Sequence, residues 1–61
     1  MNWQIEYDGR GWTLINNDGR ILGEVVWNYD VWRVFKGEVQ IAEFVYKASD
    51  SAKRYLEIEC L

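Results

Sequence analysis

Apolar and polar residues alternate along most of the chain, and short glycine-containing segments interrupt the alternation. A period of two is typical of a strand with one buried face, and glycine beside Asn or Asp is typical of a hairpin turn. The pattern predicts five strands, at about 3–7, 12–15, 21–27, 31–35 and 38–46. The strongest turn signal lies between the second and third strands, at Asn16-Asn17-Asp18-Gly19.

Two segments follow the same order of residue types, one from Trp12 to Trp27 and the other from Trp32 to Tyr46. Each has an aromatic residue, two apolar residues, a glycine turn, and an apolar return that ends in Glu-apolar-Val-aromatic. Each segment reads as a β-hairpin, so the pattern is consistent with a duplicated hairpin. The match requires a length difference at the turn and one further residue of slippage after it.

The fifth predicted strand changes phase near its centre. Val39 and Ile41 share one parity, whereas Ala42, Phe44 and Tyr46 share the other. A β-bulge near Ile41-Ala42 would place all of these side chains on one face.

The period changes again towards the C-terminus. Ala52, Tyr55 and Leu56 have helical spacing, which predicts a helix at about 50–59, and Ser49-Asp50-Ser51 is a run of N-cap residues. The predicted fold class is α+β. We expect a five-stranded antiparallel meander, made of two related hairpins plus an N-terminal strand, with one C-terminal helix packed on one face.

One helix of this length covers only part of one sheet face. The polar residues available for the uncovered face are Gln4, Glu6, Thr13, Glu24, Arg33 and Gln40. Leu22, Val26, Trp32 and Val34 do not all fit the opposite face, so apolar residues are left over. This surplus indicates a binding or dimer surface, unless a thick, curled sheet absorbs it.

The composition predicts one small domain, 1–61, that depends on aromatic packing. The chain of 61 residues has four Trp, four Tyr and two Phe but no histidine, and Cys60 is its one cysteine. An intrachain disulfide and a zinc site are therefore excluded, and we expect no cofactor or metal. The lone Cys60 fits a reducing compartment, and no apolar run is long enough for a signal peptide or membrane span. We expect a cytoplasmic protein, in the host cytoplasm if a phage encodes it.

The charge balance disfavours nucleic acid as a direct ligand. Residues 1–31 have five acidic and two basic residues, whereas residues 32–61 are balanced, and the net charge is −3. Without a basic stripe the chain lacks the electrostatic attraction that drives most nucleic-acid binding. Catalysis is also disfavoured, because histidine is the commonest acid–base group and so small a sheet offers no deep cleft. We therefore expect a protein without enzymatic activity.

The candidate site combines aromatic and acidic residues. In a meander, the first turn, the third turn and the helix start lie at one end, which would gather Asp8, Asp30 and Asp50 around Tyr29. Such a patch could imitate phosphates towards a basic site on another protein. A calcium site is a second interpretation, and the ordinary preference of Asp for turns and N-caps is a third.

The hairpin around Tyr29 is the densest aromatic stretch of the chain. Trp27, Tyr29 and Trp32 are candidate interface anchors, because Trp and Tyr bury much area at little cost in rotamer entropy. Alternatively, Trp27 and Trp32 form a cross-strand pair that stabilises the hairpin. A further alternative is stacking of the aromatic residues on single-stranded nucleic acid. The cations for that are Arg10, Arg20, Arg33 and Lys36.

The second half of the chain combines Trp32-x-Val34-x-x-Gly37 with Ile41-Ala42-x-Phe44 and Ala52-x-x-Tyr55-Leu56. Over residues 31–57 this pattern resembles the sheet-plus-helix unit of AP2-type DNA-binding domains and of the arm-binding domains of phage integrases. The resemblance implies three strands that lean on one helix, and an exposed sheet that reads DNA with basic and aromatic residues. The matching strands of this chain carry Glu38, Gln40 and Glu43 instead.

In length and acidity the whole chain resembles the small accessory proteins of phages, including anti-CRISPR and host-takeover inhibitors. That resemblance implies a protein that binds a larger host protein and inhibits it. Our leading hypothesis is therefore a protein-binding module whose partner has a basic surface, with Trp27, Tyr29 and Trp32 as anchors. The alternatives are a nucleic-acid-binding domain that uses the sheet surface, and a self-associating homodimer.

Overall fold

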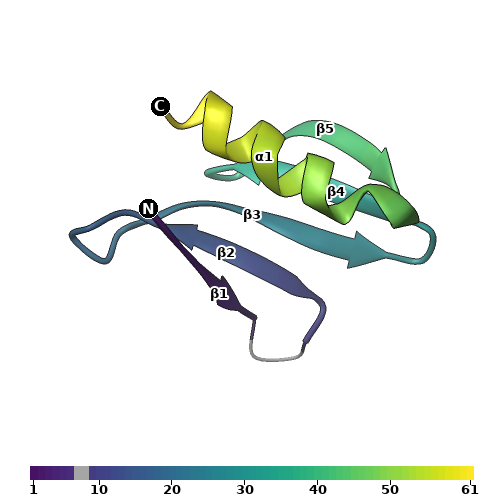
Figure 1. The fold of residues 1–61 in the computed structure, drawn as a ribbon, viewed down its shortest axis with the longest axis horizontal. Helices are drawn as coiled ribbons and strands as arrows, with labels where there is room; N and C mark the ends of the chain where they lie inside the picture. The colour runs from purple at the N-terminus through teal and green to yellow at the C-terminus, as the bar shows by residue number, and fades with distance from the viewer. Residues whose placement is uncertain (7–8) are drawn as a thin grey trace.

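The computed structural model describes residues 1–6 and 9–61 of the chain (Figure 1). Its elements are β1 (Asn2–Ile5), β2 (Gly11–Ile15), β3 (Ile21–Asn28), β4 (Val31–Lys36), β5 (Val39–Val45), the 3₁₀ helix η1 (Tyr46–Ala48) and α1 (Ser49–Glu59). The strands pair with their sequence neighbours in antiparallel fashion, in the order β1-β2-β3-β4-β5. This confirms the α+β class and the five-stranded meander with one C-terminal helix packed against it.

The first strand and the helix begin or end differently from the prediction. β1 ends at Ile5, although the Glu6 amide still donates to the Gly11 carbonyl at 3.0 Å, and Tyr7 lies outside the described residues. α1 begins at Ser49, and its N-cap Ala48 makes no side-chain capping hydrogen bond. The predicted capping residues Ser49 to Ser51 therefore lie inside the first turn, because η1 leads directly into the helix.

The core lies between α1 and one face of the sheet, which we call the helix face. Ala52 and Leu56 of α1 are fully buried against the sheet, as their helical spacing predicts. Their buried partners in the strands are Leu14, Val25, Trp32 and Val34. Leu56 packs so closely on the sheet that a Cβ on Gly23 would lie 3.0 Å from its Cδ1 and 2.2 Å from the Phe35 carbonyl oxygen. A glycine at this position therefore allows the helix to approach β3.

Both hairpins of the repeat contain a β-bulge at the same place. In β5 the pairing passes from Val34↔Ala42 to Phe35↔Gln40, so Ile41 is the extra residue, which confirms the bulge predicted near Ile41-Ala42. In β3 it passes from Leu14↔Gly23 to Ile15↔Ile21, so Leu22 is the extra residue. Both bulged side chains pack against the core. Bulges thus take up part of the predicted apolar surplus.

The opposite side of the sheet, which we call the open face, has no helix over it. By register and alternation it carries all six polar residues predicted for it: Gln4, Glu6, Thr13, Glu24, Arg33 and Gln40. It also carries apolar residues, which are Ile15, Ile21, Val26, Val31, Phe35 and Val45. Part of the apolar surplus is therefore located here, with Ile21 65% and Val45 68% exposed.

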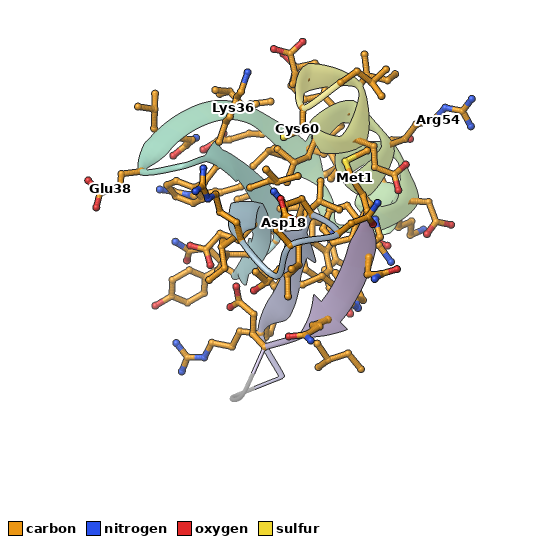
Figure 2. All side chains as sticks on the ribbon, turned by 90° about the vertical axis from the view of Figure 1, so that its left-hand side faces the viewer. Met1, Asp18, Lys36, Glu38, Arg54 and Cys60 are labelled. Atoms are coloured by element: carbon orange, nitrogen blue, oxygen red, sulfur yellow. The ribbon has the colours of Figure 1, made fainter. Side chains whose placement is uncertain are left out.

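The two ends of the sheet differ in what they carry. The turns with Asp18 and Glu38 lie at the end that faces the viewer in Figure 2, together with the end of α1 at Cys60. Here Lys36 donates through Nζ to the Glu59 carbonyl at 2.9 Å, and a cation at a helix C-terminus is favourable. The β3–β4 turn and the start of α1 lie at the other end, on the right in Figure 1.

Candidate functional site

The end of the sheet at the β3–β4 turn brings three segments of the chain together. The Trp27 amide donates to the Arg10 carbonyl at 2.7 Å, which joins the β1–β2 connection to β3. The Tyr46 amide donates to the Asp30 carbonyl at 2.9 Å, which joins η1 to the turn. The meander therefore positions the first connection, the third turn and the start of the helical segment side by side, as predicted.

Tyr29 stands at the tip of this end in an unusual backbone conformation. It and Asp30 form a two-residue turn between the paired residues Asn28 and Val31, and its φ is 61°. In the described part of the chain, all other residues with positive φ are glycines. The left-handed region costs a residue with a Cβ roughly 1–2 kcal/mol, and glycine avoids this cost. Yet the Tyr29 side chain is 86% exposed, so packing returns little of that cost.

Two further aromatic side chains are exposed beside the turn. Trp27 is 42% and Tyr46 is 56% exposed, and their ring centroids lie 5.9 Å apart with the planes inclined at 59°. We call Trp27, Tyr29 and Tyr46 together the aromatic end. Aromatic residues of this kind anchor many protein interfaces, because they bury large areas with few rotatable bonds.

Trp32 lies in the core next to the aromatic end, contacts Tyr46 and is not part of the exposed surface. Its ring stacks on Tyr46, with centroids 5.9 Å apart and planes inclined at 11°, and its Nε1 donates to the Tyr46 carbonyl at 2.6 Å. On its other side it contacts Trp12 at 5.2 Å between centroids, and it is 7% exposed. The sequence placed Trp32 among the anchors, but a side chain this deeply buried cannot meet a partner without unfolding.

An open hollow of about 350 Å³ lies at this end, lined by Arg10, Trp27, Asn28 and Tyr29. Here the exposed aromatic rings border a concave surface that has both a guanidinium and an amide group nearby. A partner side chain that enters it would contact ring faces and hydrogen-bonding groups at once.

The predicted acidic residues are distributed unevenly around this end. Asp30 is exposed in the turn itself, next to Tyr29. Asp50 is exposed in the first turn of α1 and lines a different hollow, beside Trp3 and Lys53. Asp8 lies outside the described residues. The structure thus joins Asp30 to the aromatic end and places Asp50 in the separate hollow beside α1.

Tyr46 is a candidate site residue that the sequence reasoning missed, since its parity grouped it with Ala42 and Phe44 on one face of the fifth strand. The repeat contained the signal, because Tyr46 is the counterpart of Trp27 in the second hairpin. Strand pairing ends at Val45, and η1 then carries Tyr46 back over Trp32.

Two structural features are absent from the part of the chain that the structure describes. Among residues 1–6 and 9–61, no group of three or more His, Cys, Asp or Glu side chains could hold a metal ion. No helix in the same residues is long and apolar enough to cross a membrane. No protein-family model, no curated protein and no solved structure matches this chain.

Proposed function

We propose that this chain is a protein-binding module without catalytic activity, which acts by occupying a site on a larger protein. The observation that carries the proposal is Tyr29, an aromatic residue held at φ 61° and 86% exposed. Residues in sparsely populated backbone regions cluster at active sites, ligand clamps and switch regions, so strain at an exposed aromatic residue supports a role in contact with another molecule.

The neighbours of Tyr29 support the same proposal. Trp27 and Tyr46 extend its aromatic surface along the end of the sheet. Beneath them, the hydrogen bond and stacking of Trp32 hold Tyr46 in place, so this part of the surface is positioned before a partner arrives. Preorganised aromatic anchors raise affinity because little rotamer entropy is lost on binding.

The chemistry of the partner follows from the charges around the turn. Asp30 is exposed beside Tyr29, Arg10 lines the hollow next to it, and the chain as a whole has a net charge of −3. A basic surface on the partner would therefore be attracted to this end and would be steered by it during association. Occupation of a functional basic site is the mode of inhibition that the resemblance to small phage accessory proteins implies.

The test is a pull-down with the tagged chain from a lysate of the organism that encodes it, or of its host, with and without nuclease. We expect one stoichiometric protein partner that survives nuclease, and we expect the double substitution Tyr29→Ala, Asp30→Ala to lose it. Glu38→Ala is the matched control, since it changes a turn residue at the other end of the sheet. Thermal melting of all three proteins must show that each one folds.

Two results would refute the proposal. If the double variant folds and retains the partner, the aromatic end is not the contact surface. If the wild type recovers only nucleic acid, or only proteins that nuclease removes, the alternative of a nucleic-acid-binding domain replaces it.

A further inference from the structure

The open face has two apolar clusters separated by charged residues. At the end near the β3–β4 turn, Val31 is paired with Val45, and Val26 lies on the same face one pair further along β3. At the other end, Ile15 is paired with Ile21, and Phe35 lies nearby on β4. Most of these side chains are half-buried by their neighbours in the sheet, and Ile21 and Val45 are exposed. A sheet with a surface this apolar usually buries it against a second layer.

The charged residues between the clusters are mostly acidic. Glu6, Glu24 and Glu43 lie on the open face, and Arg33 is the one cation there among the described strand residues. Arg33 is already engaged, because its Nε lies 3.5 Å from the Glu43 carboxylate. Glu24 is half-buried on the central strand β3, and within the described part of the chain its carboxylate has no hydrogen bond or ion pair. A half-buried carboxylate without a partner is poised to accept a cation from outside.

The charge on this face argues against a second copy of the chain as its occupant. Two copies packed face to face would bring three glutamates of one against three of the other, with a single arginine on each side. Like charges brought together in an interface cost affinity and suppress that pairing. The edge strands also disfavour pairing of two sheets, because β5 contains a bulge and β1 has four residues.

We propose that the open face binds an amphipathic helix of another protein, apolar on one side and flanked by lysine or arginine. Such a helix would complete a second layer on the sheet, opposite α1. Its basic residues would meet Glu24 and the Glu43 carboxylate, which would then be shared with Arg33. These two residues are two strands and about two residues apart, so their Cα atoms are separated by about 12 Å. Residues i and i+7 of a helix are separated by roughly 10.5 Å, so two basic residues with that spacing can reach both carboxylates.

The test uses two synthetic peptides of about 18 residues, each with leucines on one face of a helix. One carries lysines at i and i+7 beside the apolar face, and the other carries glutamates at those positions. Binding is measured by titration, and the contact surface is mapped by amide chemical shifts of the isotope-labelled protein. We expect the lysine peptide to bind at least tenfold more tightly than the glutamate peptide, with shifts at Val26, Phe35 and Val45.

Substitution of the two carboxylates distinguishes charge recognition from nonspecific hydrophobic binding. Glu24→Gln with Glu43→Gln should weaken binding of the lysine peptide about three- to tenfold, as the loss of two partly exposed ion pairs implies. It should leave the glutamate peptide unaffected or slightly tighter. Tyr29→Ala should bind the lysine peptide as the wild type does, because Tyr29 lies outside the open face.

Three results would overturn the inference: no binding of the lysine peptide, equal affinity for both peptides, or shifts confined to the helix face or the aromatic end. Self-association of the free protein through the open face, seen as shifts of Val26 and Val45 with protein concentration, would also overturn it. The outcome is independent of the pull-down, since each surface is altered by substitutions that leave the other intact.

Discussion

The backbone strain at Tyr29 predicts that glycine is more stabilising than alanine at this position, which is the reverse of the usual order. Replacement of alanine by glycine usually destabilises a protein by about 0.5–1 kcal/mol, because glycine loses more freedom on folding. At a position with φ near 60° the alanine itself is strained by about 1–2 kcal/mol. Tyr29→Gly should therefore be more stable than Tyr29→Ala by roughly 0.5–1 kcal/mol. The comparison of the two variants cancels the small loss of tyrosine burial, since both remove the whole ring.

Two other turn positions provide matched controls. Asp30 follows Tyr29 in the same turn and does not have a positive φ, so Asp30→Gly should be less stable than Asp30→Ala by about 0.5–1 kcal/mol. Gly37 has φ 63° in the two-residue turn between β4 and β5, and a Cβ added there meets nothing within 4 Å. Gly37→Ala should therefore cost about 0.5–1 kcal/mol through backbone strain without any clash.

The assay is thermal and urea unfolding of all five variants under identical conditions. A difference of 1 kcal/mol corresponds to a shift in Tm of about 4–8 °C in a domain of this size, so the expected differences are measurable. Equal stability of Tyr29→Gly and Tyr29→Ala, or greater stability of the alanine variant, would refute the strain at this position. Both Tyr29 variants should lose the partner equally in the pull-down, although one is more stable, which would separate binding from folding.

Three further predictions concern the packing of the core and of the helix face. Trp32→Phe should lower the free energy of unfolding in urea by about 2 kcal/mol, because it removes buried volume and a buried hydrogen-bond donor. Trp27→Phe should lower it by less than about 0.5 kcal/mol, because Trp27 is exposed. Equal losses for the two variants would contradict the difference in burial. Gly23→Ala should cost about 2 kcal/mol or more, because the new methyl group meets the backbone of β4 and Leu56, and a neutral result would disprove that close approach. Lys53→Met should cost about 0.5–1 kcal/mol, because the Lys53 ammonium lies 4.5 Å from the ring centroid of Trp12 and 5.3 Å from that of Trp3. A loss of stability that is unchanged in high salt would point to packing instead.

Local pattern was sufficient for the strands and for the bulge in β5. The alternation of side chains and the glycine turns are local signals, and the phase change around Ile41 marks an extra residue directly. The equivalent bulge at Leu22 was not predicted, although the repeat implied it. The next residue, Gly23, occupies a core-facing position but has no side chain. The phase change at this bulge is therefore not visible in the hydrophobic pattern.

The candidate site could be predicted only in part, because burial within a hairpin depends on distant elements. Trp27 and Trp32 are directly paired across the β3–β4 hairpin, so the sequence treats them alike. Their difference in exposure arises because η1 folds Tyr46 over Trp32, and Trp12 closes the other side. The hydrogen bond from Trp32 Nε1 to the Tyr46 carbonyl lies at the start of the same helical segment. The N-cap position falls on Ala48 and not on the predicted Ser49 to Ser51, because η1 runs directly into α1.

The registers of the two hairpins clarify the repeat. Four cross-strand pairs of the first hairpin correspond to four pairs of the second. In the first hairpin they are, in order, Trp12↔Val25, Thr13↔Glu24, Leu14↔Gly23 and Ile15↔Ile21. Their counterparts in the second hairpin, in the same order, are Trp32↔Phe44, Arg33↔Glu43, Val34↔Ala42 and Phe35↔Gln40. The outgoing strands are offset by twenty residues and the returning strands by nineteen throughout. A one-residue difference confined to the turn therefore relates the hairpins, and the second slippage expected from the sequence is unnecessary.

This relation also explains why the strained residue stands where it does. Tyr29 and Asp30 connect the two related hairpins and belong to neither of them, so their identity is not tied to either register. A residue at such a junction can change without disturbing the pairing or the bulges on either side. Glycine would suit the φ of 61° best, as Gly37 does in the turn with nearly the same φ. The fold neither requires nor rewards an aromatic side chain at this junction, and for that reason Tyr29 carries the proposal that this end of the sheet contacts another molecule.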